Sequence, residues 1–115
     1  MKMEYQIFAE GTKIKEIRLS RTQSNALFET KAWANSDLTP YIWKDGEDKN
    51  EISVVNILDK ELRWELQEGI LIALLAIGRS HLSEKKSAVE SSELISLTDL
   101  LLTICDINVD AIRIG

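Results

Sequence analysis

Apolar and polar residues alternate along the first part of the chain. Every second residue from 3 to 9 is apolar. This period of two is typical of a strand with one buried face. Residues 13–19 continue in the same way, with Ile17 and Leu19 on one face, and Gly11 offers a turn between the two segments. The pattern therefore predicts an N-terminal β-hairpin.

Residues 21–35 fit two different periods. Alternation of a strand would place Leu27 and Trp33 on one face, whereas helical spacing would group Ala26, Thr30 and Trp33. Since the preceding segments already form a sheet, we expect a strand here.

Two more strands are expected on either side of an acidic stretch. Residues 41–43 and 51–58 are rich in Ile, Val and aromatic side chains, which favour strands. The polar segment between them contains Asp45-Gly46, a turn signal. Because this polar segment, residues 44–51, has eight residues, which is long for a tight hairpin, we predict a protruding loop.

The period changes to that of a helix from Asp59 to about residue 83. Either Asp59 or Asn56 can cap the start of this helix. Two apolar stripes lie on roughly opposite sides of its helical wheel: Leu62, Leu66, Ile70, Ala73, Leu74 and Ile77 in the first, and Trp64, Leu71, Leu75 and Leu82 in the second. We therefore expect the helix to be buried on several sides, against the sheet and against a second helix.

The run GILIALLAIG within this helix is too short to be a membrane span. Ten residues cover about 15 Å, whereas a span needs about 20 residues. A second helix is predicted over 92–105, with Leu94, Leu97, Leu101 and Ile104 on one face, and Ile112 and Ile114 indicate a last strand or extended tail.

These elements predict one domain over residues 1–115 with an α+β fold. A mainly antiparallel sheet is built from the N-terminal half and the C-terminal strand. The two principal helices, about 59–83 and 92–105, pack on one face of it.

The net charge of −5 changes the range of expected partners. Residues 51–115 hold eleven acidic and six basic residues, against eight of each in 1–50, so the excess lies in the C-terminal part. Nucleic acids and anionic membranes attract an excess of Lys and Arg, so neither is expected as a partner. A basic protein fits this charge better, although a solubilising surface is the common alternative.

Three glutamates of the long helix are the first candidate site. Glu61, Glu65 and Glu68 have the spacing i, i+4 and i+7, which places them on one face. They could meet a basic protein surface. The structural alternative is that acidic residues in the first turns of a helix are favoured by its macrodipole.

Asp45, Glu47 and Asp48 of the polar segment are a second candidate, with Trp43 beside them. The position of Gly46 does not fit a calcium-binding loop, so no metal is expected there. Aromatic residues dominate protein interfaces when they are exposed. Trp43 is the tryptophan that we expect to be exposed, if any is.

The remaining reactive or charged side chains favour structural interpretations. We expect His81 to be a surface residue late in a helix, and Cys105 to be a small core residue. A single cysteine excludes an intramolecular disulfide and a thiolate cluster. The basic residues Lys13, Lys15, Arg18 and Arg21 are interrupted by Glu16, and no nucleic-acid motif accompanies them.

Three hypotheses of function follow. The first is a non-catalytic module that binds a basic protein, such as a bacterial immunity protein or antitoxin that neutralises a toxin. The second is a subunit of a homo-oligomer or larger assembly. The third is a small enzyme that works through carboxylates, which would need two acids in one cleft. We expect no cofactor, and a cytoplasmic location because no signal peptide is recognised.

Overall fold

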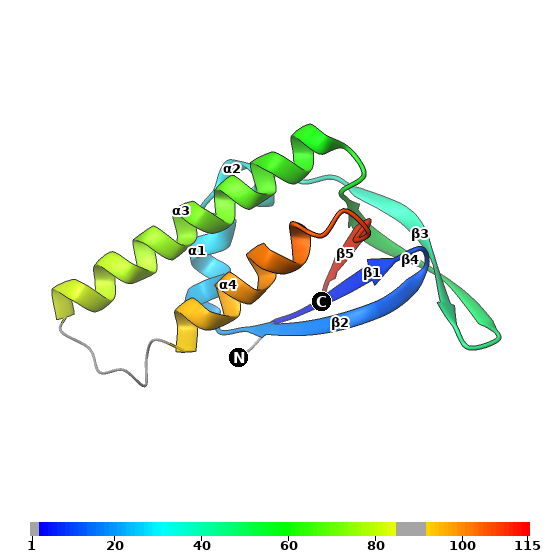
Figure 1. Cartoon of the computed structure of the whole chain (residues 1–115), viewed down its shortest axis with the longest axis horizontal. Helices are drawn as coiled ribbons and strands as arrows, with labels where there is room; N and C mark the ends of the chain where they lie inside the picture. Colours follow the sequence, from blue (N-terminus) through cyan, green and yellow to red (C-terminus); the bar gives the residue numbers. More distant parts are fainter. Residues whose placement is uncertain (1–2, 85–91) are drawn as a thin grey trace.

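The computed structural model describes residues 3–84 and 92–115, with the side chains of 3–80 and 94–115. Five antiparallel strands form one sheet: β1 (Met3–Ala9), β2 (Thr12–Leu19), β3 (Leu38–Asp45), β4 (Asp48–Asn56) and β5 (Ala111–Ile114). Their order is β2-β1-β5-β4-β3, so the last strand lies at the centre, between the two hairpins (Figure 1). The predicted N-terminal hairpin and C-terminal strand are confirmed.

Four helices lie on one side of this sheet: α1 (Arg21–Phe28), α2 (Lys31–Ala34), α3 (Lys60–Glu84) and α4 (Ser92–Ile104). The predicted α+β fold and the positions of the two long helices are confirmed. At the start of α3, the side chain of Asp59 accepts a hydrogen bond from the amide of Glu61 at 2.9 Å, as expected of a cap.

The strand predicted within residues 21–35 is wrong, because α1 and α2 occupy this segment. Ser20 and Gln23 form a capping box: the Gln23 amide donates to Ser20 Oγ at 3.2 Å, and the Ser20 amide donates to Gln23 Oε1. Leu27 and Trp33 are buried in the main core, together with residues of α3 and of the sheet.

The loop predicted between β3 and β4 is also wrong. Both strands continue through the polar segment to a two-residue turn at Gly46-Glu47. Gly46 adopts a φ of 63°, which glycine allows without steric cost. Because both faces of this hairpin end are exposed, polar residues there say little about whether the backbone is paired. The hairpin projects beyond the helices (Figure 1).

The helix α3 is buried along one stripe only. Leu66, Ile70, Ala73 and Ile77 are buried, and α3 packs along α4 on one side and along α1 and α2 on the other. The second predicted stripe faces solvent: Trp64, Leu71 and Leu75 are at least half exposed. The side chain of Leu82 lies outside the described residues. The expected packing of α3 against the second helix, α4, is confirmed, whereas the expected burial of its second apolar stripe is wrong.

The sheet carries apolar clusters on both faces. The main core lies under the helices and includes Tyr5, Ile7, Val55 and Ile112. Their neighbours in sequence point the other way, where Phe8, Val54 and Ala111 form a small cluster with Tyr41, Trp43 and Ile52. On this face the β1–β2 turn meets the edge strand β3, since the amide of Lys44 donates to the carbonyl of Gly11 at 2.8 Å. The sheet is thus curled at the end that carries the two hairpins.

Candidate protein-binding surface

The outer side of the first half of α3 combines one tryptophan with the three predicted glutamates. Trp64 is 78% exposed, and Glu61, Glu65 and Glu68 are exposed on the same side of the helix. We call these four residues the acidic tryptophan face. The helix positions them by spacing alone, because residues three and four apart are neighbours on its surface.

The glutamates of this face form no ion pair with any basic residue in the described parts of the chain. The ion pairs found there join Lys13 to Glu16, Lys15 to Asp99, and Arg18 to Glu4. Lys31 of α2 lines a hollow of about 270 Å³ with Glu65 and Glu68, but lies beyond ion-pairing distance. The acidic tryptophan face therefore keeps its negative charge available to another molecule.

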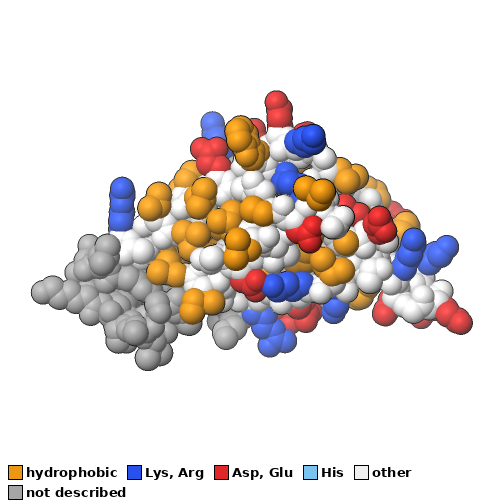
Figure 2. Space-filling view, in the orientation of Figure 1, with side chains coloured by type: hydrophobic (Ala, Val, Ile, Leu, Met, Phe, Trp, Pro, Cys, Tyr) orange, Lys and Arg blue, Asp and Glu red, His pale blue; other side chains and the backbone are white. Residues whose placement is uncertain are grey.

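Beside Trp64 lies an apolar hollow of about 530 Å³. Its walls include Leu58 and Ile107, which are among the most exposed large apolar side chains of the described chain. Exposed apolar side chains gather over α3 and α4 (Figure 2). Large exposed apolar patches mark interaction sites more often than scattered single residues do.

Arg63 and Gln67 line this hollow and also hold the end of α4. The guanidinium of Arg63 donates to the carbonyls of Ile104 at 3.0 Å and Asp106 at 2.8 Å, and also to those of Ile57 and Val109. Gln67 Nε2 donates to Ile104 at 3.2 Å. The last carbonyls of a helix have no hydrogen-bond donors within the helix, and Arg63 provides such a donor at the end of α4. This arginine is therefore structural, whereas its neighbour Trp64 projects outward.

Cys105 was expected in the core but is exposed, at the rim of the same hollow. It follows the last residue of α4, where the buried positions are Leu97, Leu100 and Ile104. Position 105 is one residue past this stripe and faces away from it. The stripe of buried leucines thus predicted the core side of α4 but not the side of its final residue. The side chain of His81 lies outside the described residues.

The predicted choice of Trp43 as the exposed tryptophan is wrong. Its ring lies 5.6 Å from that of Phe8, and the Lys13 Nζ lies 5.8 Å from its centroid. It is half-buried, while Trp64 is the most exposed tryptophan. Sequence spacing held a signal for this: Trp64 follows Glu61 by three residues and precedes Glu68 by four, so it shares their side of the helix.

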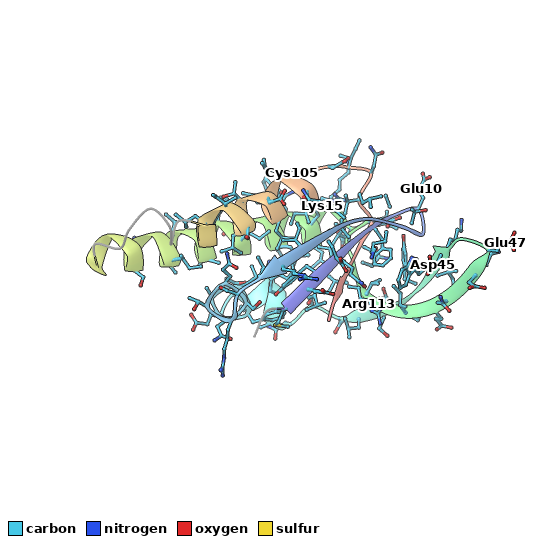
Figure 3. All side chains as sticks on the ribbon, turned by 90° about the horizontal axis from the view of Figure 1, so that it is seen from below. Glu10, Lys15, Asp45, Glu47, Cys105 and Arg113 are labelled. Atoms are coloured by element: carbon cyan, nitrogen blue, oxygen red, sulfur yellow. The ribbon has the colours of Figure 1, made fainter. Side chains whose placement is uncertain are left out.

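The predicted acidic residues fall into two separate groups. Asp45, Glu47 and Asp48 are exposed at the turn between β3 and β4. Figure 3 shows Asp45 and Glu47 at the far end of this hairpin, away from α3 and α4. They do not join the acidic tryptophan face, so the structure offers two acidic surfaces rather than one.

A polar network closes the curled end of the sheet. The hydroxyl of Tyr41 donates to Asp110 Oδ1 at 2.8 Å and accepts from the Gly11 amide at 2.6 Å, while Asp110 Oδ2 accepts from the Glu10 amide at 3.0 Å. Burial, reinforced by the hydrogen bond to the Asp110 carboxylate, raises the pKa of Tyr41 to about 12. Burial likewise raises the pKa of Tyr5. The Tyr41 hydroxyl and both carboxylate oxygens of Asp110 are hydrogen-bonded within this network, which therefore has a structural role.

Residues that could hold a metal do not converge in the described parts of the chain, where no three His, Cys, Asp or Glu side chains form a suitable group. No described helix is long and apolar enough to cross a membrane.

Comparisons with known proteins give no relative for this chain. It matches no protein-family model, and no curated protein and no solved structure is significantly similar to it.

Proposed function

We propose that this chain is a non-catalytic module that binds a basic protein through its acidic tryptophan face. The observation that carries the proposal is Trp64, a large aromatic residue that is 78% exposed among three unpaired glutamates. A tryptophan ring left in water does not contribute the favourable free energy of burying its apolar surface. The exposed position of Trp64 is therefore best explained by a partner that covers the ring.

The two components of the face have different roles. Exposed tryptophans are frequent hot spots of binding energy when a partner buries them. Complementary charge mainly accelerates encounter and selects the partner. We therefore expect Trp64 to set the lifetime of the complex, and Glu61, Glu65 and Glu68 to set its rate of formation and its salt dependence.

Neutralisation of a basic toxin, as by an immunity protein or antitoxin, is the form of this function that fits the charge of the chain best. The partner would then be encoded next to this chain, and binding would cover its basic active surface. A carboxylate-dependent enzyme is less well supported, because Glu61, Glu65 and Glu68 are exposed on the outer side of α3.

The test uses a basic protein encoded beside this chain, with affinity measured by calorimetry and the association rate by stopped-flow fluorescence, each at several salt concentrations. We expect Trp64→Ala to weaken binding by about 30-fold or more. The pair Glu61→Lys with Glu65→Lys should slow association and reduce its dependence on salt. The pair Glu29→Lys with Glu51→Lys, an equal charge change at exposed sites outside α3, is the matched control. If Trp64→Ala and the paired reversal bind a demonstrated partner as tightly as the unmodified chain does, the proposed surface is wrong.

A further inference from the structure

The exposed side of α3 continues past the acidic tryptophan face as a row of four side chains. Glu68, Ile72, Leu75 and Arg79 are all exposed and are separated by four, three and four residues. On a helix this spacing places them in one nearly straight row, about 16 Å long. Neither Glu68 nor Arg79 forms an ion pair with another described residue.

The row is complementary to itself when a second copy runs in the opposite direction. A two-fold axis that passes between Ile72 and Leu75 places Arg79 of a second copy opposite Glu68, and Leu75 of that copy opposite Ile72. The apolar residues Ile72 and Leu75 of the two copies therefore meet at the centre of the contact. At each end, Glu68 of one copy meets Arg79 of the other. This is the self-complementarity that a symmetric, isologous interface requires.

We propose that a second copy of this chain packs antiparallel along α3 through Glu68, Ile72, Leu75 and Arg79. A parallel copy would instead set Glu68 against Glu68 and Arg79 against Arg79, which is unfavourable. The residues that flank the row permit a close approach: Ala76 is small, and a Cβ added at Gly78 would meet nothing within 4 Å. Leu71, half exposed beside the row, adds apolar area.

This pairing does not rest on the proposed function. Glu61, Trp64 and Glu65 lie outside the row, and only Glu68 belongs to both surfaces. A contact one helix wide is at the lower end of interface sizes, so we expect a dimer that dissociates in the micromolar to sub-millimolar range. Because Glu68 is shared, a basic partner and a second copy would compete for α3.

The test is sedimentation equilibrium of the whole chain over that concentration range. We expect Glu68→Arg and Arg79→Glu each to raise the dissociation constant about ten-fold or more, since each change places like charges together at both ends of the interface. The double variant, which exchanges the two charges, should restore the dimer. Glu51→Arg and Arg21→Glu, at exposed sites of β4 and α1, are matched controls that should leave it unchanged.

Circular dichroism of each variant establishes that it is folded, which we expect because every substituted side chain is exposed. A chain that stays monomeric at the highest concentration overturns the proposal. So does a dimer that neither single charge reversal weakens. Single variants that weaken the dimer while the double variant fails to restore it overturn the antiparallel register. Trp64 lies outside the row, so Trp64→Ala tests the basic partner separately from the dimer.

Discussion

The indole Nε1 of Trp33 donates a hydrogen bond of 2.8 Å to the backbone carbonyl of Leu66, in the first third of α3. This contact brings α2 directly against the backbone of the long helix. Gly69 makes the approach possible, since a Cβ at this position would lie 2.7 Å from Trp33 Cδ1 and 2.8 Å from Thr30 Oγ1. The glycine that begins the run GILIALLAIG is thus a packing residue.

The two glycines of α3 should respond in opposite ways to the same substitution. Gly69→Ala forces Trp33 and Thr30 to move, and we expect it to lower the free energy of unfolding by about 1–3 kcal/mol. Gly78→Ala has open space around it and removes the helix penalty of glycine, so it should raise that free energy by about 0.5–1 kcal/mol. Urea unfolding of both variants measures the difference, and equal effects would contradict the packing role of Gly69.

Arg63 is expected to be the main link between α3 and the end of α4. Arg63→Met keeps much of the aliphatic side chain but removes the donors to the carbonyls of Ile57, Ile104, Asp106 and Val109. We expect a loss of about 2–4 kcal/mol in the free energy of unfolding. Arg21→Met, at an exposed position of α1, serves as the control and should change it by less than about 0.5 kcal/mol. A similar value for both variants would show that the carbonyls find other donors.

Stability should fall in alkaline solution partly because of Tyr41. Its pKa is near 10 in the unfolded chain and is raised to about 12 in the folded protein. The neutral phenol therefore stabilises the fold below pH 10, and this contribution is lost as the pH rises from 10 towards 12. Tyr41→Phe should show a shallower loss of stability over this interval, measured by urea unfolding at several pH values. An unchanged pH profile would mean that Tyr5 and other groups account for it.

Collisional quenching should distinguish the three tryptophans. Trp33 is 1% exposed and Trp43 is half-buried, so Trp64 should account for most of the fluorescence that acrylamide quenches. We expect Trp64→Phe to reduce the quenching constant by about half or more, because the ring most accessible to solvent is then absent. Trp43→Phe is the matched control. If both variants reduced the quenching constant equally, Trp43 and Trp64 would be equally accessible to solvent, which would contradict the prediction.

Much of the fold follows from local patterns in the sequence. The alternation around Ile17 and Leu19 and the buried stripe of Leu66, Ile70 and Ile77 each predicted the correct element, because burial on one face imposes a period on the sequence. Where both faces of an element are exposed to solvent, as at the end of the β3–β4 hairpin, the sequence carries no such period. That is why the paired strands there were taken for a loop.

The error over residues 21–35 had a different origin. Ser20 and Gln23 have the spacing of a capping box, which indicates a helix start, whereas the strand was expected only because the preceding segments form a sheet. The candidate site was predicted only in part. Glu61, Glu65 and Glu68 are exposed together as expected, whereas Trp64 was assigned to a buried stripe. Periodicity shows that a helix has two apolar sides but not which of them is covered, since that depends on how many neighbouring elements the chain provides.

The central position of β5 affects the order in which the molecule is built. The hairpins β1–β2 and β3–β4 are local and can form early, but only residues 111–114 join them into one sheet. A ribosome-bound chain that has not reached these residues holds two sheet edges without a partner. Such edges readily pair with other chains, so the interval before β5 emerges is when nascent molecules are most prone to aggregate.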